Sequence, residues 1–264
     1  MPDRQIESFD GTPLNVRLEG PEGGPVLMLA HSLGGSIDLW RETAPLLAER
    51  FRVARYDARG HGVSGAPEGD YSVEMMGRDA LAILDAIGAE KAHYAGLSMG
   101  GMIGMWLAAH QGGRIDRLVL ANTTARIPAT DRLNGWIRTA REEGAAGVAG
   151  LAPPIITGWL CAGFKAAHPE RTAELVAAMA DMSVPGFAGA IAVLRDSDRR
   201  PDLPLIKAPT LVIAGVENPQ GQDAAQALVA AIPGATLAIL PDAAHLSPVE
   251  NPRAFADAVL KHLG

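Results

Sequence analysis

The chain has 264 residues and a formal net charge of −7 at pH 7. Because it is acidic and contains no Lys/Arg-rich run, we expect no nucleic-acid partner. Hydrophobic residues make up 48% of the chain, enough for a sizeable core. No apolar run approaches the ~18 residues of a membrane span, so we expect no membrane association. The single cysteine, Cys161, excludes an internal disulfide, and the first residues resemble no signal peptide; both features predict a cytoplasmic protein.

Short apolar runs alternate with amphipathic stretches along most of the chain. The Asp10-Gly11 pair predicts the turn of an opening hairpin between residues 6–9 and 15–18. Buried strands are expected at residues 25–30, 52–57, 92–98, 117–121, 210–214 and 236–240. Apolar residues at three- and four-residue spacing predict helices at 39–50, 73–88, 102–110, 223–232 and 252–263. Strands separated by helices predict an α/β fold with a mostly parallel sheet flanked by helices.

This alternation stops between residues 124 and 204, where we find no convincing strand. The segment instead carries helical patches at 133–143, 171–182 and 187–194, separated by prolines that include Pro153 and Pro154. We therefore expect a core made of residues 1–123 and 205–264, with residues 124–204 forming a helical cap over the sheet. Trp136 and Trp159 are candidates for the apolar lining of a substrate cleft beneath this cap.

The pentapeptide Gly96-Leu97-Ser98-Met99-Gly100 lies between an expected strand and an expected helix. A serine on such a strand-to-helix turn is held in a strained backbone with its hydroxyl exposed, and the flanking glycines leave room for the turn. An ordinary glycine-rich turn would give the same short match, but here the strand, the helix and a late histidine all accompany it. We interpret Ser98 as a nucleophile.

A serine hydroxyl needs a neighbouring base and donors for the developing oxyanion. His245 follows an expected strand and precedes the last helix, which would bring it beside Ser98 at the carboxyl edge of the sheet. The glycines of His31-Ser32-Leu33-Gly34-Gly35 would let backbone N–H groups face the same cleft. The expected oxyanion hole is formed by the N–H groups of Leu33 and Met99. We read His31 as shaping this loop.

We expect neither a metal nor a cofactor. The histidines are scattered, without paired Cys/His or His-x-x-x-His spacing, and no Gly-x-Gly-x-x-Gly follows the first strand.

In order along the chain, these motifs resemble the α/β-hydrolase superfamily. They are His-Ser-Leu-Gly, Tyr-Asp-x-Arg-Gly-His-Gly-x-Ser (residues 56–64), Gly-Leu-Ser-Met-Gly-Gly and a late Ala-His-Leu (residues 244–246). Within that superfamily the chain is most similar to the 3-oxoadipate enol-lactonases, nearly end to end and least in the cap. The resemblance implies that Ser98 is the nucleophile and His245 the base, with Leu33 and Met99 in the oxyanion hole.

The sequence departs from that family at the acid of the catalytic triad. The family places an aspartate in a Gly-x-x-Asp-Pro pattern, where this chain has Gly215-Val216-Glu217-Asn218-Pro219. Asn218 matches the aspartate, and Asn122, at the other common acid position, is also neutral. Three explanations remain open. Glu217 reaches His245 through a shifted loop, or Asn218 occupies the position in a weakened, repurposed or deliberately mutated enzyme, or a more distant carboxylate serves instead. We favour Glu217 slightly.

The best-supported function is hydrolysis of a small carboxylic ester or enol-lactone through an acyl-serine intermediate. If this small-molecule substrate carries a carboxylate, an arginine must bind it. Arg132, Arg138 and Arg141 of the first cap helix are candidates, although a solvated helix face is the blander interpretation. Because of Asn218, two alternatives stay open: a hydrolase-fold enzyme with altered chemistry (perhydrolase, haloperoxidase or lyase) and a low-turnover ligand-binding module.

Overall fold

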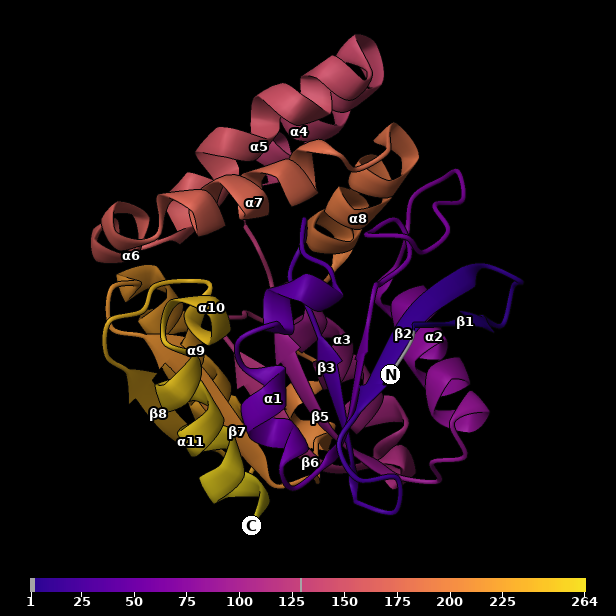
Figure 1. Cartoon of the computed structure of the whole chain (residues 1–264), viewed down its shortest axis with the longest axis vertical. Helices are drawn as coiled ribbons and strands as arrows, with labels where there is room; N and C mark the ends of the chain where they lie inside the picture. The colour runs from indigo at the N-terminus through magenta and orange to yellow at the C-terminus, as the bar shows by residue number, and fades with distance from the viewer. Residues whose placement is uncertain (1–2, 129) are drawn as a thin grey trace.

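The computed structural model describes residues 3–128 and 130–264, and in these ranges it contains an eight-stranded sheet (Figure 1). The sheet order is β1 (Arg4–Glu7), β2 (Pro13–Glu19), β4 (Arg52–Tyr56), β3 (Val26–Ala30), β5 (Ala92–Leu97), β6 (Ile115–Ala121), β7 (Thr210–Gly215) and β8 (Thr236–Leu240). β1 pairs antiparallel with β2, and β2 with β4, whereas all pairs from β4 to β8 are parallel. The predicted α/β class is confirmed.

Helices cover both faces of this sheet. α1 (Ala44–Ala48) packs beside α11 (Pro252–Leu263) in front of the sheet in Figure 1, whereas α2 (Val73–Ala86) packs beside α3 (Met99–His110). α9 (Pro219–Ala231) follows β7, and the short α10 (Ser247–Glu250) precedes α11. Every residue of β3, β5 and β7 is buried, as expected for parallel strands covered on both faces.

The continuous helix expected at residues 39–50 is wrong. The chain instead forms a 3₁₀ turn at Ile37–Trp40 and then the separate helix α1. Pro45 lies in the first turn of α1, where its missing N–H needs no partner, and inside one long helix it would remove a hydrogen bond.

The segment between β6 and β7 folds into helices stacked at one end of the sheet (Figure 1). They are α4 (Thr130–Glu143), α5 (Ala145–Trp159), α6 (Ala162–Ala167), α7 (Pro169–Ala180) and α8 (Val184–Asp196). α4 packs against α5 and α8, and α5 packs against α7. We call residues 130–196 the cap.

Helix α5 corrects the sequence interpretation, which took Pro153 and Pro154 as a break. Both prolines lie inside the helix. A proline in a helix interior costs about 3 kcal/mol, but α5 buries Val148, Ile155 and Ile156 against its neighbours. Burial of these side chains contributes about 1.5–3 kcal/mol each, enough to offset a cost of about 6 kcal/mol for the two prolines.

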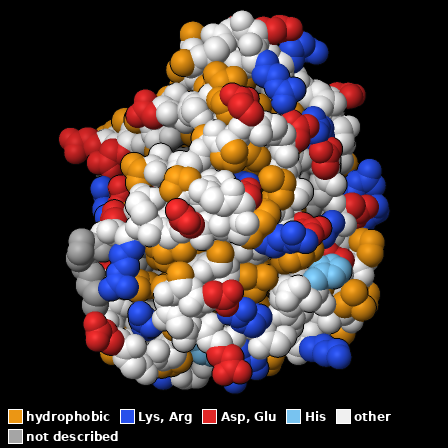
Figure 2. Space-filling view, turned by 90° about the vertical axis from the view of Figure 1, so that its right-hand side faces the viewer, with side chains coloured by type: hydrophobic (Ala, Val, Ile, Leu, Met, Phe, Trp, Pro, Cys, Tyr) orange, Lys and Arg blue, Asp and Glu red, His pale blue; other side chains and the backbone are white. Residues whose placement is uncertain are grey.

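Among the described residues, no single helix is long and apolar enough to cross a membrane; α7 and α8 pass that test only as a pair bent by 97°. On the face shown in Figure 2, acidic and basic side chains are interspersed rather than segregated by charge.

Candidate active site

Ser98 occupies a strained turn between β5 and α3. Its φ of 53° and ψ of −111° lie outside the regions that side-chain-bearing residues prefer. A Cβ at Gly96 would overlap the carbonyl group of Gly100, and a Cβ at Gly100 would overlap that of Ala30. The Ser98 N–H bonds the carbonyl oxygen of Ala121 at 2.9 Å. The two glycines are therefore what allows the chain to turn here and present the serine.

The two backbone N–H groups expected to form an oxyanion hole have no hydrogen-bond acceptor in the described part of the chain. Met99 opens α3, so its N–H has no acceptor within the helix. Among the described residues, the N–H of Leu33 also has no hydrogen-bond acceptor. His31 holds the Leu33 loop: its Nε2 accepts the N–H of Ala58 at 3.0 Å, which leaves the proton on Nδ1 to be donated to the Ser32 carbonyl oxygen at 2.7 Å. His31 thus shapes the loop, as the sequence indicated.

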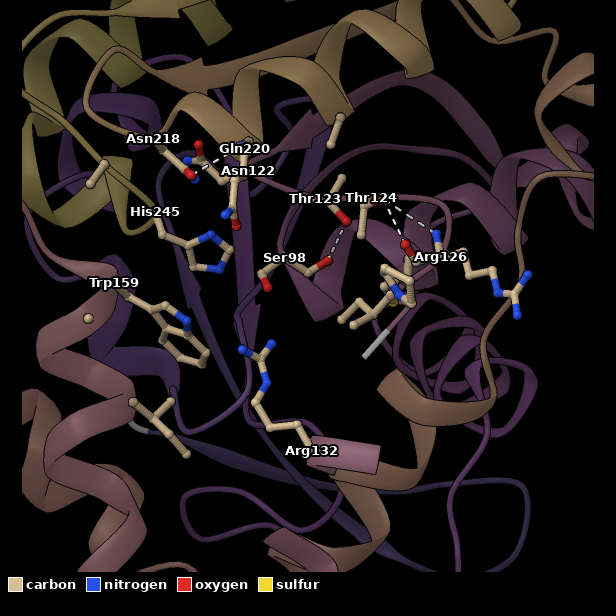
Figure 3. A pocket seen from close by; sticks show the side chains of 18 of the residues that line it. Ser98, Asn122, Thr123, Thr124, Arg126, Arg132, Trp159, Asn218, Gln220 and His245 are labelled. Atoms are coloured by element: carbon tan, nitrogen blue, oxygen red, sulfur yellow. Dashed lines mark hydrogen bonds between the residues drawn. The ribbon is translucent and has the colours of Figure 1, made fainter. Parts of the chain in front are cut away.

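His245 lies on the loop after β8, next to Ser98 in Figure 3. Its backbone N–H donates to the carbonyl oxygen of Trp159 at 2.9 Å, and the imidazole packs against the Trp159 indole with ring centroids 5.1 Å apart and ring planes tilted by 39°. Nε2 is buried and has no hydrogen-bond partner among the described residues. Burial lowers the pKa of this imidazole to about 4. His245 is therefore neutral at pH 7, as a general base must be.

A cavity of about 830 Å³ joins these side chains between the sheet and the cap. It is lined from the core by Ser98, Met102, Asn122, Thr123, Thr124, Glu217, Asn218, Gln220, Gly221, Ala224, Ala244 and His245, and from the cap and the segment before it by Arg126, Ile127, Pro128, Arg132, Trp136, Leu151, Pro154, Ile155, Gly158 and Trp159. The core residues of this wall follow the carboxyl ends of parallel strands, where α/β proteins place their ligand sites.

The three candidate arginines of α4 separate in the structure. Arg132 lines the cavity, and its guanidinium points toward Ser98 in Figure 3. Its Cζ atom lies 5.3 Å from the centroid of the Trp136 ring. Arg138 is exposed and does not line the cavity. Arg141 is exposed and pairs with Asp70 of the core at 2.9 Å. Only Arg132 of the three can therefore meet a bound ligand.

The candidate acids have other contacts. The Asn218 Oδ1 accepts the Gly221 N–H at 3.0 Å and so caps α9. The Glu217 N–H donates to the Ala243 carbonyl oxygen at 2.9 Å, whereas its side chain is exposed at the cavity wall. Within residues 3–128 and 130–264, no carboxylate forms a hydrogen bond with the His245 ring.

Asn122, the second neutral residue at an acid position, is buried at the end of β6 with a φ of 43°. Its amide oxygen accepts the Gly215 N–H at 3.0 Å, and its Nδ2 donates to the Ser247 hydroxyl at 2.7 Å. Asn122 therefore ties β6 to β7 and to α10.

The Tyr-Asp-x-Arg-Gly-His-Gly motif supports the site without entering it. Asp57 accepts the N–H groups of Ile37 and Val63 at 2.7 and 3.1 Å, and the buried Arg59 forms a bidentate pair with Asp79. These contacts fix the loop against which His31 is held.

Sequence reasoning missed several residues of the cavity wall. Thr123, Thr124 and Arg126 follow β6, and Gln220 opens α9. Their position just beyond the carboxyl ends of β6 and β7 is the signal that could have found them.

Comparison with known proteins agrees with this geometry. A family model described as the alpha/beta hydrolase fold matches residues 25–252. The chain is 36% identical over 247 residues to 3-oxoadipate enol-lactonase 2 of Acinetobacter baylyi, covering 93% of this chain and 91% of that protein. The enol-lactonase structure from Burkholderia xenovorans LB400 superimposes with a TM-score of 0.93 at 34% identity and 99% coverage of each chain.

A thermophilic esterase from Thermogutta terrifontis, solved with malate bound, has a TM-score of 0.91 at 26% identity and covers 100% of this chain and 98% of its own. The resemblance to enol-lactonases that the motifs carried is confirmed. This chain belongs to the α/β-hydrolase family.

Proposed function

We propose that this chain hydrolyses a small enol-lactone or carboxylic ester that carries a free carboxylate, through an acyl-serine intermediate. Its family and its relatives make it a hydrolase of esters or lactones. The finer proposal rests on one observation: Ser98, His245 and the guanidinium of Arg132 share one cavity. The names of the relatives support it, since one acts on 3-oxoadipate enol-lactone and another was solved with malate, a dicarboxylate, bound.

In this mechanism His245 removes the proton of the Ser98 hydroxyl as the oxygen attacks the lactone carbonyl carbon. The developing oxyanion accepts hydrogen bonds from the free N–H groups of Leu33 and Met99. When the tetrahedral intermediate collapses, the ring C–O bond breaks and His245 gives its proton to the leaving enol oxygen. Water, deprotonated by His245, then releases the acid and regenerates Ser98.

The imidazolium formed in each step needs an anionic neighbour, and we propose Glu217 for this role. Its carboxylate lines the cavity, is exposed, and has no hydrogen-bond donor among the described residues, so it is free to turn toward His245. Burial and the neighbouring Glu250 raise the pKa of the Cys161 thiol, two residues beyond Trp159, and the charge of Glu217 adds a smaller contribution. Catalytic hydrogen bonds are often unformed before substrate binds.

Arg132 is proposed to bind the carboxylate of the substrate. A guanidinium offers two parallel N–H donors to a carboxylate, and the apolar wall at Ile127, Leu151 and Ile155 would take the carbon skeleton. In an acidic protein, one arginine facing the nucleophile gives an anionic ligand a fixed orientation.

Replacing Arg132 by Leu tests this assignment against Arg138→Leu, a change on the same helix away from the cavity. We expect Arg132→Leu to raise KM for an anionic enol-lactone by roughly 10-fold or more, the scale of a charge-assisted hydrogen bond, and to spare a neutral ester of similar size. Equal effects of Arg132→Leu on both substrates, or an effect of Arg138→Leu on the anionic one, would contradict it.

A second candidate is a ligand-binding protein with slow turnover. The observation that favours it is the neutral Asn218 at the family's acid position, where an amide cannot stabilise imidazolium as a carboxylate does. Rapid mixing with a chromogenic ester separates the two. A burst of product shows that Ser98 is acylated; saturable binding without a burst identifies the binding protein.

A further inference from the structure

Glu250, the last residue of α10, holds three backbone N–H groups with one side chain. Its Oε2 accepts from Ala244 and from Leu246, both at 2.9 Å. Its Oε1 accepts from Cys161 at 2.7 Å. Ala244 and Leu246 are the two residues that flank the catalytic base, and Cys161 belongs to the cap.

This carboxylate has no basic partner among the described residues. It is partly buried, and burial raises its pKa, whereas the N–H groups of Cys161, Ala244 and Leu246 oppose that shift. A buried carboxylate is costly unless its oxygens are hydrogen-bonded. The three donors therefore specify an acceptor side chain here, because an apolar one would leave three backbone N–H groups without a partner.

The cap contacts the same loop a second time. The His245 N–H donates to the Trp159 carbonyl oxygen, and the Trp159 indole packs against the imidazole in a tilted contact. Residues 159–161 of the cap and 244–246 of the core are thus joined by one direct hydrogen bond and by Glu250 bridging the positions on either side. This junction holds the backbone from which the imidazole projects, and Trp159 packs against the ring itself.

We propose that Glu250 is a positioning residue for His245, and that the cap segment 159–161 is part of the support of the base. The proposal rests on His245 being the base of the hydrolytic reaction. Glu250 acts by fixing the backbone on both sides of His245: it touches neither substrate nor the imidazole. Loss of its carboxylate leaves the cavity intact but lets the imidazole turn away from the Ser98 hydroxyl.

Glu250→Gln and Glu250→Leu test this, with Asp257→Asn as the control. Asp257 is an exposed carboxylate of α11, the helix directly after Glu250, and pairs only with Arg253 in the described residues. A glutamine retains one oxygen, enough for the Ala244 and Leu246 donors, and turns an N–H toward that of Cys161. A leucine satisfies none of the three.

We expect kcat to fall roughly 10-fold in Glu250→Gln and roughly 100-fold in Glu250→Leu, the cost of a misplaced catalytic group, with KM changed by less than about 2-fold. Backbone amide exchange should accelerate at residues 159–161 and 244–246 in both variants and stay unchanged in Asp257→Asn. In all three variants the backbone amides of the sheet strands should stay protected from exchange.

A rise in KM equal to the fall in kcat, or faster exchange throughout the sheet, would overturn the proposal, because either would show a general structural role. Wild-type kcat in Glu250→Gln with unchanged exchange at Cys161 would overturn it too. A wild-type protein that hydrolyses no ester or lactone would instead reject the proposed function, and the exchange measurement would still decide whether Glu250 joins the two segments.

Discussion

Replacing Glu217 by Gln removes the carboxylate proposed to pair with His245 while keeping the size of the side chain. In the structure, burial alone lowers the pKa of the His245 imidazole from 6.5 to about 4. At 1.36 kcal/mol for each pKa unit, imidazolium is then roughly 3 to 4 kcal/mol harder to form than in water. Because imidazolium forms in each chemical step, a carboxylate that removes this cost would accelerate turnover by roughly 300-fold.

The assay is the pH dependence of kcat, which reports groups in the enzyme–substrate complex. The base is active when neutral, so kcat rises as the pH rises through its pKa. With Glu217 engaged, the acid limb in the wild-type protein should lie well above pH 4. In Glu217→Gln it should move down to about 4, the value that burial alone gives, and the plateau should fall by roughly 300-fold.

Asn218→Asp is the paired variant. If Glu217 serves as the acid, a second carboxylate one residue away competes for the same imidazole, and turnover should be unchanged or lower. The reasoning is refuted if Glu217→Gln leaves both the plateau and the acid limb in place. A gain in turnover in Asn218→Asp, up to the ~10⁴ seen for the converse change in serine proteases, would then identify residue 218 as an acid position left empty. Flat responses to both variants would point to a more distant carboxylate.

Three further predictions address the nucleophile, the elbow and acid stability. Ser98→Ala and His245→Ala should each abolish hydrolysis without unfolding the chain, and the double variant should be hardly worse in a single-turnover assay, since members of one catalytic unit are non-additive; additive losses would show independent roles. Gly100→Ala should lower both activity and the melting temperature, because its Cβ meets the Ala30 carbonyl group, and a wild-type melting curve would contradict this. Burial lowers the pKa of His61 to about 3, so the unfolded chain takes up a proton below pH 6.5 that the folded chain does not. Between pH 7 and 4.5 this difference removes roughly 2 to 3 kcal/mol of stability, and urea unfolding of His61→Gln should show a smaller loss.

The sequence predicts the structure correctly where the residues of one short segment determine its geometry. Gly96 and Gly100 are spaced for a turn that only glycine permits, so the strand, the turn and the helix around Ser98 could be predicted together. Hydrophobic runs located the buried strands β3 to β7 for the same reason, whereas β8, also expected to be buried, lies at the edge of the sheet with most of its side chains exposed. The end of α5 could not be predicted from Pro153 and Pro154, because burial against the other cap helices decides that helix and no neighbouring residue reports it.

The arginines of α4 show the same limit at the site. Arg132, Arg138 and Arg141 carry the same charge on one helix, and their sequence spacing alone does not tell which side faces the cleft when the partner surface is unknown. The structure separates them through the direction of α4 over the sheet and through Asp70, which holds Arg141 outside. Glu250 was missed because its three partners include Cys161, 89 positions away along the chain.

The acid position illustrates why a normal fold does not reveal altered chemistry. Residue 218 begins α9 by accepting the Gly221 N–H, and the resemblance to the enol-lactonases implies that an aspartate here would also carry the charge that supports the histidine. Asn and Asp cap helices about equally well, so the change to Asn keeps the first function at almost no cost in stability. In our proposal the charge comes instead from Glu217, and it has no effect until a proton moves to His245. A chain with Asn218 therefore folds like its relatives, and we expect the source of the charge to be visible only in the pH dependence of turnover, where the paired variants at positions 217 and 218 will show which residue supplies it.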